Sequence, residues 1–232
     1  MIVSNKWKAR LAVCLLAVFA SMGCNPILLT ARLLNPEDPQ EKAEFPLTPH
    51  PKREKEEVRV VVLTSCALGI SPDLNGIEHL LAAEVIPLLA KRCEENKEKV
   101  LVFKSAPLEE YKRDHPEWRS MHPKDIGKDE YFKADYVIDI EILEISIYEP
   151  RSKNQLLRGR AKIALAAYDC SKPLKEAAFP STEMNFEFPR THEVSVYDVP
   201  ASTFRQKFIK RIAADLVVKF TAHNTDQRMP ID

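Results

Sequence analysis

The feature that most constrains the fold is a pair of alternating segments in the second half of the chain. Between residues 136 and 147 isoleucines alternate with acidic residues, and between residues 157 and 165 apolar residues alternate with basic ones. A period of two is typical of a strand with one buried and one solvated face. Because residues 149–155 form a polar turn between the segments, we expect an antiparallel hairpin in which acidic and basic rows face each other.

The first strand of this hairpin changes phase along its length. Its apolar set passes from even-numbered to odd-numbered positions, and the two sets are Ile138, Ile140 and Ile142, then Leu143, Ile145 and Ile147. A slip of one residue is what a β-bulge produces, so we expect a bulge near the middle of the strand.

The preceding part of the chain has a strand–helix–strand pattern. Residues 58–63 are mostly β-branched, residues 72–93 carry an apolar stripe of helical period, and residues 100–103 are apolar again. Ser71 is the expected N-cap and Pro72 the first helical residue, while Pro87 should bend or end this helix. The pattern predicts a parallel βαβ unit.

A short strand around residues 184–188 and a long helix over residues 201–220 complete the expected elements. The helix repeats an apolar residue every four positions from Phe204 to Phe220, so one side should lie on the sheet. The predicted fold class is α/β: a single domain with a mixed sheet, formed by a parallel βαβ start and an antiparallel hairpin, and helices packed on it.

The N-terminus reads as a secretory signal. Lys6, Lys8 and Arg10 precede a run of ten apolar residues, 11–20, followed by small residues. Ten residues are too few to cross a bilayer as a helix, which needs about 20. We therefore expect residues 1–23 to be removed.

The end of this signal resembles that of bacterial lipoproteins, in which a small residue precedes a cysteine. Gly23 and Cys24 match, whereas Ser21 stands where the family usually has leucine. The resemblance implies that Cys24 carries lipid, palmitate included, and anchors the chain to a membrane. Asn25 is not the family's usual inner-membrane signal, aspartate, so a periplasmic protein on the outer membrane is expected. The alternatives are an ordinary cleaved signal, with Cys24 a spare thiol, and an uncleaved N-terminal helix.

Composition separates a tether from the domain and excludes some partners. Residues 24–57 hold six prolines and no glycine, which predicts a tether before a domain over residues 58–223 and a disordered tail over residues 224–232. Beyond the signal the chain has 31 basic and 34 acidic residues, so nucleic acid is not an expected partner. No glycine-rich phosphate motif occurs, and we expect no cofactor.

Candidate reactive groups are sparse. Cys66 follows the first strand and could act as a nucleophile with His79 as base, but no third group orients them. The cysteines of the domain could form one disulfide or, as we favour, lie buried as small apolar residues; they are Cys66, Cys93 and Cys170.

The long irregular segment before the hairpin has two possible sites. Its acidic residues and histidines lack metal-ligand spacing, so we expect no metal site; they are Asp114, His115, His122, Asp125, Asp129 and Glu130. Its aromatic residues either form a surface for a partner or fold down onto the core; they are Tyr111, Trp118, Tyr131 and Phe132.

A second resemblance concerns the hairpin. Its strands open with Ala134-Asp135-Tyr136-Val137 and contain Arg158-Gly159-Arg160-Ala161 before Tyr168-Asp169. This resembles periplasmic α/β lipoprotein domains: the curli-secretion lipoprotein, the penicillin-binding-protein activator lipoproteins and the N-terminal domain of the Tol translocation protein. The resemblance implies a domain that binds partner proteins and catalyses nothing. We therefore expect a lipid-anchored adaptor of unspecified oligomeric state; the alternatives are an auxiliary lipoprotein of an envelope transporter and a Cys66-dependent hydrolase.

Overall fold

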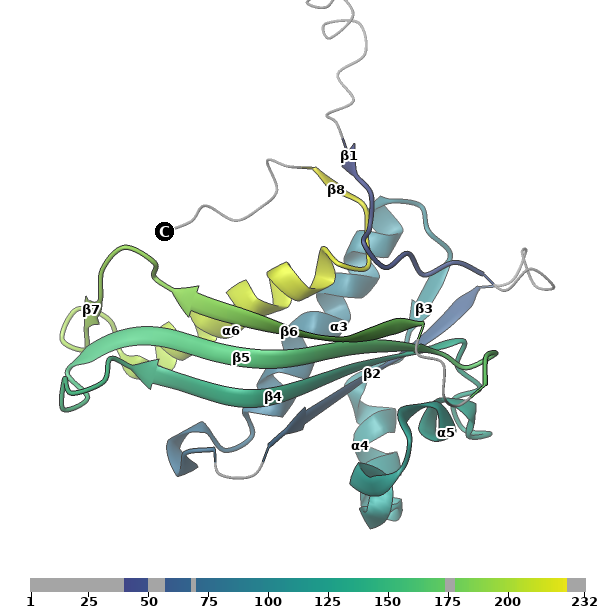
Figure 1. The fold of residues 1–232 in the computed structure, drawn as a ribbon, viewed down its shortest axis with the longest axis horizontal. Helices are drawn as coiled ribbons and strands as arrows, with labels where there is room; N and C mark the ends of the chain where they lie inside the picture. The colour runs from purple at the N-terminus through teal and green to yellow at the C-terminus, as the bar shows by residue number, and fades with distance from the viewer. Residues whose placement is uncertain (1–39, 50–56, 68–69, 174–177, 225–232) are drawn as a thin grey trace, which may run out of the picture. The chain divides into compact units, whose positions relative to one another are not determined.

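The computed structural model describes residues 40–49, 57–67, 70–173 and 178–224. Figure 1 shows a twisted sheet with helices against it. The elements, in chain order, are β1 (Gln40–Glu41), β2 (Val58–Cys66), η2 (Pro72–Leu74), α3 (Ile77–Glu95), β3 (Val100–Val102), α4 (Ser105–Asp114), η3 (Pro116–Ser120), α5 (Pro123–Lys128), β4 (Tyr136–Tyr148), β5 (Leu156–Asp169), β6 (Phe179–Phe188), β7 (Val194–Ser195), α6 (Ala201–Val217) and β8 (His223–Asn224).

The main sheet is mixed, as predicted. Its strand order is β3-β2-β4-β5-β6, with β7 beside β5, and β1 and β8 form a separate two-stranded sheet. Strand β2 runs parallel to β3 and to β4, whereas β5 is antiparallel to both β4 and β6. The α/β class with a parallel start and an antiparallel hairpin is therefore confirmed.

The first long helix begins later and ends later than expected. Pro72 opens a 3-10 turn, and α3 starts only after Gly76, whose φ of 76° interrupts the helical path. Pro87 does not end α3, which continues to Glu95. Because proline has no N–H, the carbonyl of Ala83 has no hydrogen-bond donor at Pro87. Both residues lie on the exposed side of the helix, where water can satisfy this carbonyl.

The predicted bulge is present, but of the acidic row of β4 only Glu144 lies opposite a basic residue, Lys162, as expected. The register between β4 and β5 shifts between Ile142 and Glu144. Asp139 and Glu141 lie opposite alanines of β5. The basic row of β5 instead contacts acids on its other side and in the turn, because β6 supplies a third strand; Lys162, for example, pairs with Glu183 at 2.8 Å.

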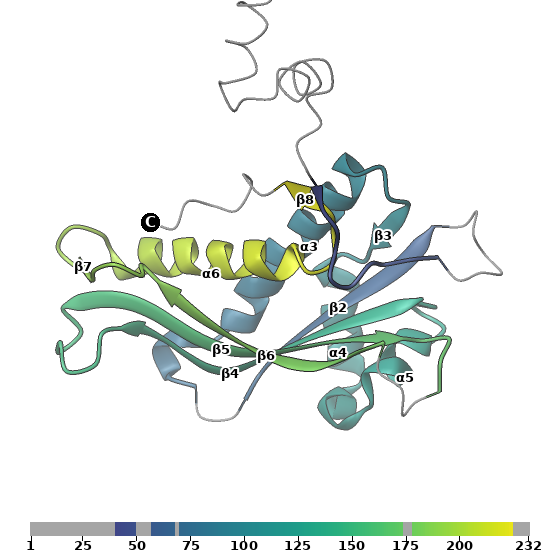
Figure 2. The same cartoon turned by 45° about the horizontal axis from the view of Figure 1, so that its top comes forward.

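Apolar side chains cover both faces of the sheet. On one face α3 and α6 pack over the even-numbered isoleucines of β4, and Figure 2 shows α6 lying along the sheet. The predicted packing of the last helix is confirmed. Helix and sheet approach closely at Gly159, where an added Cβ would lie 2.6 Å from the ring of Phe208. On the other face α4 and α5 enclose a smaller cluster around Val137 and Phe132.

Residues 105–133 are more regular than the sequence suggested. Helix α4 spans ten residues of the segment that was expected to be irregular, and the stretch after it contains η3. Strand β6 likewise begins at Phe179 rather than near residue 184. In both cases tertiary contacts extend an element whose local pattern is weak, through Leu108 and Tyr111 in α4 and through pairing with β5 in β6.

Part of the segment expected to be a tether lies against the domain. Leu47 is buried and Phe45 packs on the main core. The amide of Phe45 donates to the carbonyl of Lys219 at 2.7 Å, and the hydroxyl of Tyr136 donates to the carbonyl of Thr48 at 3.0 Å. The expected signal and Cys24 lie outside the described residues, as does most of the predicted tail. Within the described ranges no helix is long and apolar enough to cross a bilayer.

Candidate binding groove

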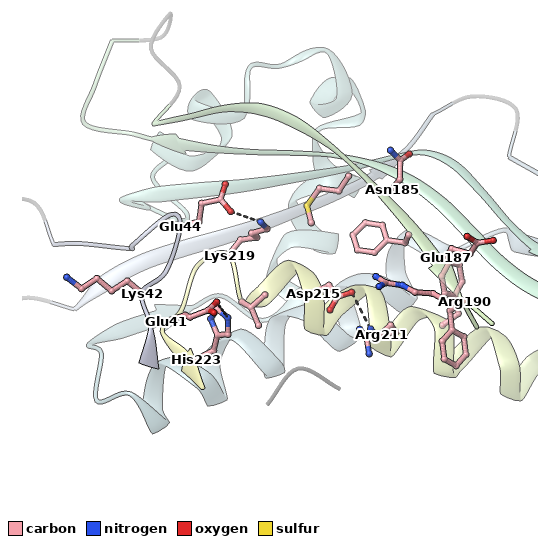
Figure 3. Close-up of a pocket in the computed structure, with 15 residues that line it drawn as sticks. Glu41, Lys42, Glu44, Asn185, Glu187, Arg190, Arg211, Asp215, Lys219 and His223 are labelled. Atoms are coloured by element: carbon pink, nitrogen blue, oxygen red, sulfur yellow. Dashed lines mark hydrogen bonds and ion pairs between the residues drawn. The ribbon is translucent and has the colours of Figure 1, made fainter. Parts of the chain in front are cut away.

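A groove of about 770 Å³ lies between β6 and α6. Figure 3 shows the side chains that line it, contributed by both elements and by residues 41–44 at one end. The groove exists because β6 is the last strand of the sheet in the described part of the chain, and α6 lies beside it without covering its edge.

The floor of the groove is apolar and aromatic. Phe208 of α6 is fully buried and Phe186 of β6 nearly so. The ring of Phe188 stacks on that of Phe208 with centroids 6.5 Å apart and lies 5.7 Å from that of Phe204. Because Phe188 is only half-buried, part of this aromatic surface faces the groove.

The rim of the groove carries charges of both signs. Arg211 pairs with Asp215 at 3.3 Å along α6, and Lys219 pairs with Glu44. An apolar floor inside a polar rim is typical of a protein-binding surface. Balanced charge does not favour a small, highly charged ligand.

The outer edge of β6 has no neighbouring strand among the described residues. Such an edge presents unpaired N–H and C=O groups, and proteins commonly protect edges with prolines and charges. Pro180 and Pro189 stand near the two ends of this ten-residue strand, while its middle carries no proline. The middle of the edge is therefore open to pairing.

The solvent face beside this edge is an ordered ladder of charges. Along β5 the residues are basic, and along β6 their partners are acidic: Lys162 lies 2.8 Å from Glu183, and Arg160 lies 3.3 Å from Glu187. Arg158 also contacts Glu187, at 3.7 Å. Successive strands thus alternate in charge toward the edge.

The four aromatic residues proposed from the sequence as a partner surface do not form one patch. Tyr111 and Phe132 are buried, at 4% and 1% exposure, and belong to the smaller core cluster. Trp118 is half-buried, and the ammonium of Lys112 lies 4.6 Å from its ring centroid. Tyr131 is 52% exposed. Of the two alternatives stated above, folding onto the core is the one that Tyr111 and Phe132 adopt.

Cys66 lies in a second, smaller cavity of about 230 Å³, with Trp118 and the carboxylates of Asp139 and Glu141. Burial and the neighbouring Glu78 carboxylate raise the pKa of the Cys66 thiol to about 12. The thiol donates to Glu78 at 3.4 Å and is therefore not paired with a histidine base.

The other candidate reactive groups are also without a catalytic arrangement. His79 lies 3.5 Å from Glu109. Cys93 and Cys170 are buried, and all three domain cysteines are free thiols. Among the described residues, no three histidine, cysteine or acidic side chains come together as a metal site would require.

Burial also perturbs Asp139. Desolvation, with a smaller contribution from the Glu141 charge, raises the pKa of this carboxyl to about 6. Asp139 faces α5 and η3 across the smaller cavity. Its perturbation follows from burial of a charge without a salt-bridge partner among the described residues.

Sequence reasoning missed the groove between β6 and α6. A signal for it exists, since Met184, Phe186 and Phe188 alternate with polar residues over a stretch flanked by prolines. That pattern indicates an edge strand with one apolar face. What the pattern does not contain is the position of α6 relative to that edge.

Comparisons with known proteins yield structural similarity only. No protein-family model matches the chain, and no curated protein matches its sequence. Lipoprotein GNA1162 from Neisseria meningitidis is similar over 58% of this chain and 87% of its own, at 16% identity and a TM-score of 0.39. The hypothetical protein CT253 from Chlamydia trachomatis is similar over 70% and 96%, at 14% identity and a TM-score of 0.43. Protein XCC0632 from Xanthomonas campestris is similar over 75% and 89%, at 13% identity and a TM-score of 0.41. Because the identities and TM-scores are this low, no functional property is transferred to this chain.

Proposed function

We propose that this protein is a lipid-anchored lipoprotein of the cell envelope that binds a partner protein in the groove between β6 and α6 and catalyses no reaction. Cys24 is the lipid attachment point. The lipid inserts into the outer membrane, and the domain lies in the periplasm. The domain is held there by the chain that follows Cys24.

The observation that carries the proposed binding role is the open edge of β6 beside an aromatic floor. The partly exposed ring of Phe188 supplies apolar area, the buried rings of Phe186 and Phe208 support it from below, and the ion pairs around it supply a polar rim. Aromatic residues at the centre of a surface contribute most of the binding energy in protein interfaces. The groove is larger than the cavity at Cys66, and it is bounded by β6 and α6.

The absence of catalysis is proposed from the chemistry of the described reactive groups. A thiol whose pKa is raised to about 12 is protonated at neutral pH, so Cys66 does not supply the thiolate that a nucleophilic hydrolase needs. Its hydrogen-bond partner is a carboxylate rather than a histidine. These features argue against the hydrolase alternative.

Two experiments test the anchor and the groove separately. Metabolic labelling with a palmitate analogue should mark the wild-type protein and not Cys24→Ala, and the variant should leave the membrane fraction. A photo-crosslinking amino acid at Val218, which lines the groove, should capture an envelope protein in intact cells, while the same residue at Glu94, exposed on α3, should not. The Cys66→Ser variant should capture the same protein; loss of capture in that variant, or no capture from Val218, would contradict the proposed function.

A further inference from the structure

The chemistry of the groove specifies the kind of segment that fits it, which deepens and rests on the proposed function. We infer that the partner contributes an extended segment that pairs with the outer edge of β6, with apolar side chains toward α6 and two basic side chains, four residues apart, toward solvent.

The backbone of β6 is the first reason. Its outer edge is unpaired in the described part of the chain, and only another extended backbone satisfies such an edge along its length. A bound helix would leave those N–H and C=O groups to water. Pro180 and Pro189 limit pairing to the residues between them.

The apolar face is the second reason. Side chains of an added strand that lie opposite Met184, Phe186 and Phe188 point to the same face as these residues, because cross-strand neighbours share a face. They would therefore enter the groove above Phe208. Met184 and Phe188 are only partly buried in the chain alone, so an added strand would complete their burial.

The charge ladder is the third reason, and it specifies the opposite face. Charges alternate from basic on β5 to acidic on β6 through the pairs of Lys162 with Glu183 and of Arg160 with Glu187. Glu183 and Glu187 remain 58% and 44% exposed after this pairing. An added strand continues the alternation of charge if it places basic residues opposite Glu183 and Glu187. Because these two glutamates are four residues apart, the basic residues of the partner are four apart as well.

A second copy of this chain fits the edge less well. Antiparallel pairing of two β6 strands centred on Glu183 places that glutamate opposite itself, and pairing centred on Asn185 places Glu183 opposite Glu187. Like charges directly opposite each other destabilise a sheet. Registers centred on Met184 or Phe186 avoid that repulsion, but they set both glutamates against uncharged residues, because no odd-numbered residue of β6 is basic. The occupant that continues the alternation of charge is therefore a different protein with basic residues at these positions.

The test reads the register of the bound segment. A photo-crosslinking amino acid is placed at Ser181 or at Asn185, two exposed uncharged positions four apart on the solvent face of β6, in the full chain in intact cells. The two variants should crosslink to one continuous segment of one partner, at sites about four residues apart. That segment should carry lysine or arginine on one face and apolar residues on the other.

A charge variant provides the quantitative control. Replacing Glu183 and Glu187 with glutamine removes two cross-strand attractions and should lower the crosslink yield from Asn185 by about 2- to 30-fold. The matched variant with Glu94→Gln and Glu95→Gln on α3 should leave the yield unchanged. Circular dichroism of both variants checks that the fold is retained.

The outcomes separate this inference from the proposed function. Crosslinks to scattered segments, to a helix, or to another copy of this chain overturn strand pairing with a basic partner, as does a yield insensitive to Glu183 and Glu187. Capture from Val218 without capture from Ser181 and Asn185 also overturns strand pairing and leaves the groove as the binding site. No capture from any of these positions overturns the proposed function as well.

Discussion

Replacing Asp139 with asparagine should stabilise the protein at neutral pH, although the substitution removes a native charge. Burial raises the pKa of Asp139 from 3.8 to about 6, so its ionised form is disfavoured in the folded state. The difference between these two pKa values corresponds to about 3 kcal/mol of unfolding free energy. Asp139 lines a cavity that water can enter, and contact with water lowers the cost of its charge. We therefore expect the substitution to raise the unfolding free energy at pH 7 by at most about 3 kcal/mol.

The sign of the pH dependence follows from proton binding. Between pH 4 and about 6 the folded state binds more protons at Asp139 than the unfolded state does. The contribution of this group to the unfolding free energy therefore falls as pH rises through that window and is constant above it. In the Asp139→Asn variant this fall should be absent, so the difference between the two proteins should grow from pH 4 to pH 7.

Urea denaturation of the wild type and the variant at several pH values between 4 and 8 measures this difference. Asp198→Asn is the matched control, because Asp198 is exposed. A variant that is less stable than wild type at pH 7, or a difference that does not change with pH, would refute the assignment of Asp139 as a buried charge without compensation.

Three further predictions follow from particular contacts. Gly159→Ala should lower the unfolding free energy by about 1–3 kcal/mol, because its Cβ would lie 2.6 Å from the ring of Phe208; Gly76→Ala, whose Cβ has only His79 nearby, at 3.9 Å, tests backbone strain alone. Phe208→Ala should cost about 3–5 kcal/mol in thermal or urea denaturation, since this ring is fully buried, and an effect below 1 kcal/mol would contradict its place in the core. Cys66 should react with iodoacetamide at pH 7.5 far more slowly than a cysteine placed at the exposed Ser181, measured by mass spectrometry of the alkylated peptides; equal rates would contradict the raised thiol pKa.

The sequence predicted what depends on local periodicity. Alternation located the hairpin, and the parity change after Ile142 located the bulge, because both follow from the two-residue repeat of a strand. The repeat of phenylalanine and aliphatic residues in α6 likewise predicted its buried side. These predictions were correct because each element buries one face, and the spacing of its apolar residues shows which face that is.

What the sequence did not predict depends on contacts between distant segments. The acidic residues of β4 and the basic residues of β5 are complementary in sequence, yet the register places alanines opposite Asp139 and Glu141. The groove was missed for the same reason, since it arises where α6 stops short of the edge of β6. The sequence left Tyr111 between surface and core, and its burial depends on residues distant in the chain, such as Phe132, whose ring centroid lies 5.2 Å away.

The docking of residues 41–49 bears on how the domain should be produced for biochemistry. A fragment begun at Val58, where the strand pattern starts, would lack Leu47 and Phe45 and would expose the end of α6 that they cover. It would also lack Glu44, the ion-pair partner of Lys219, and so one wall of the groove. The minimal expression unit for binding studies therefore begins no later than Glu41, and a shorter fragment that fails to bind carries no information about the groove.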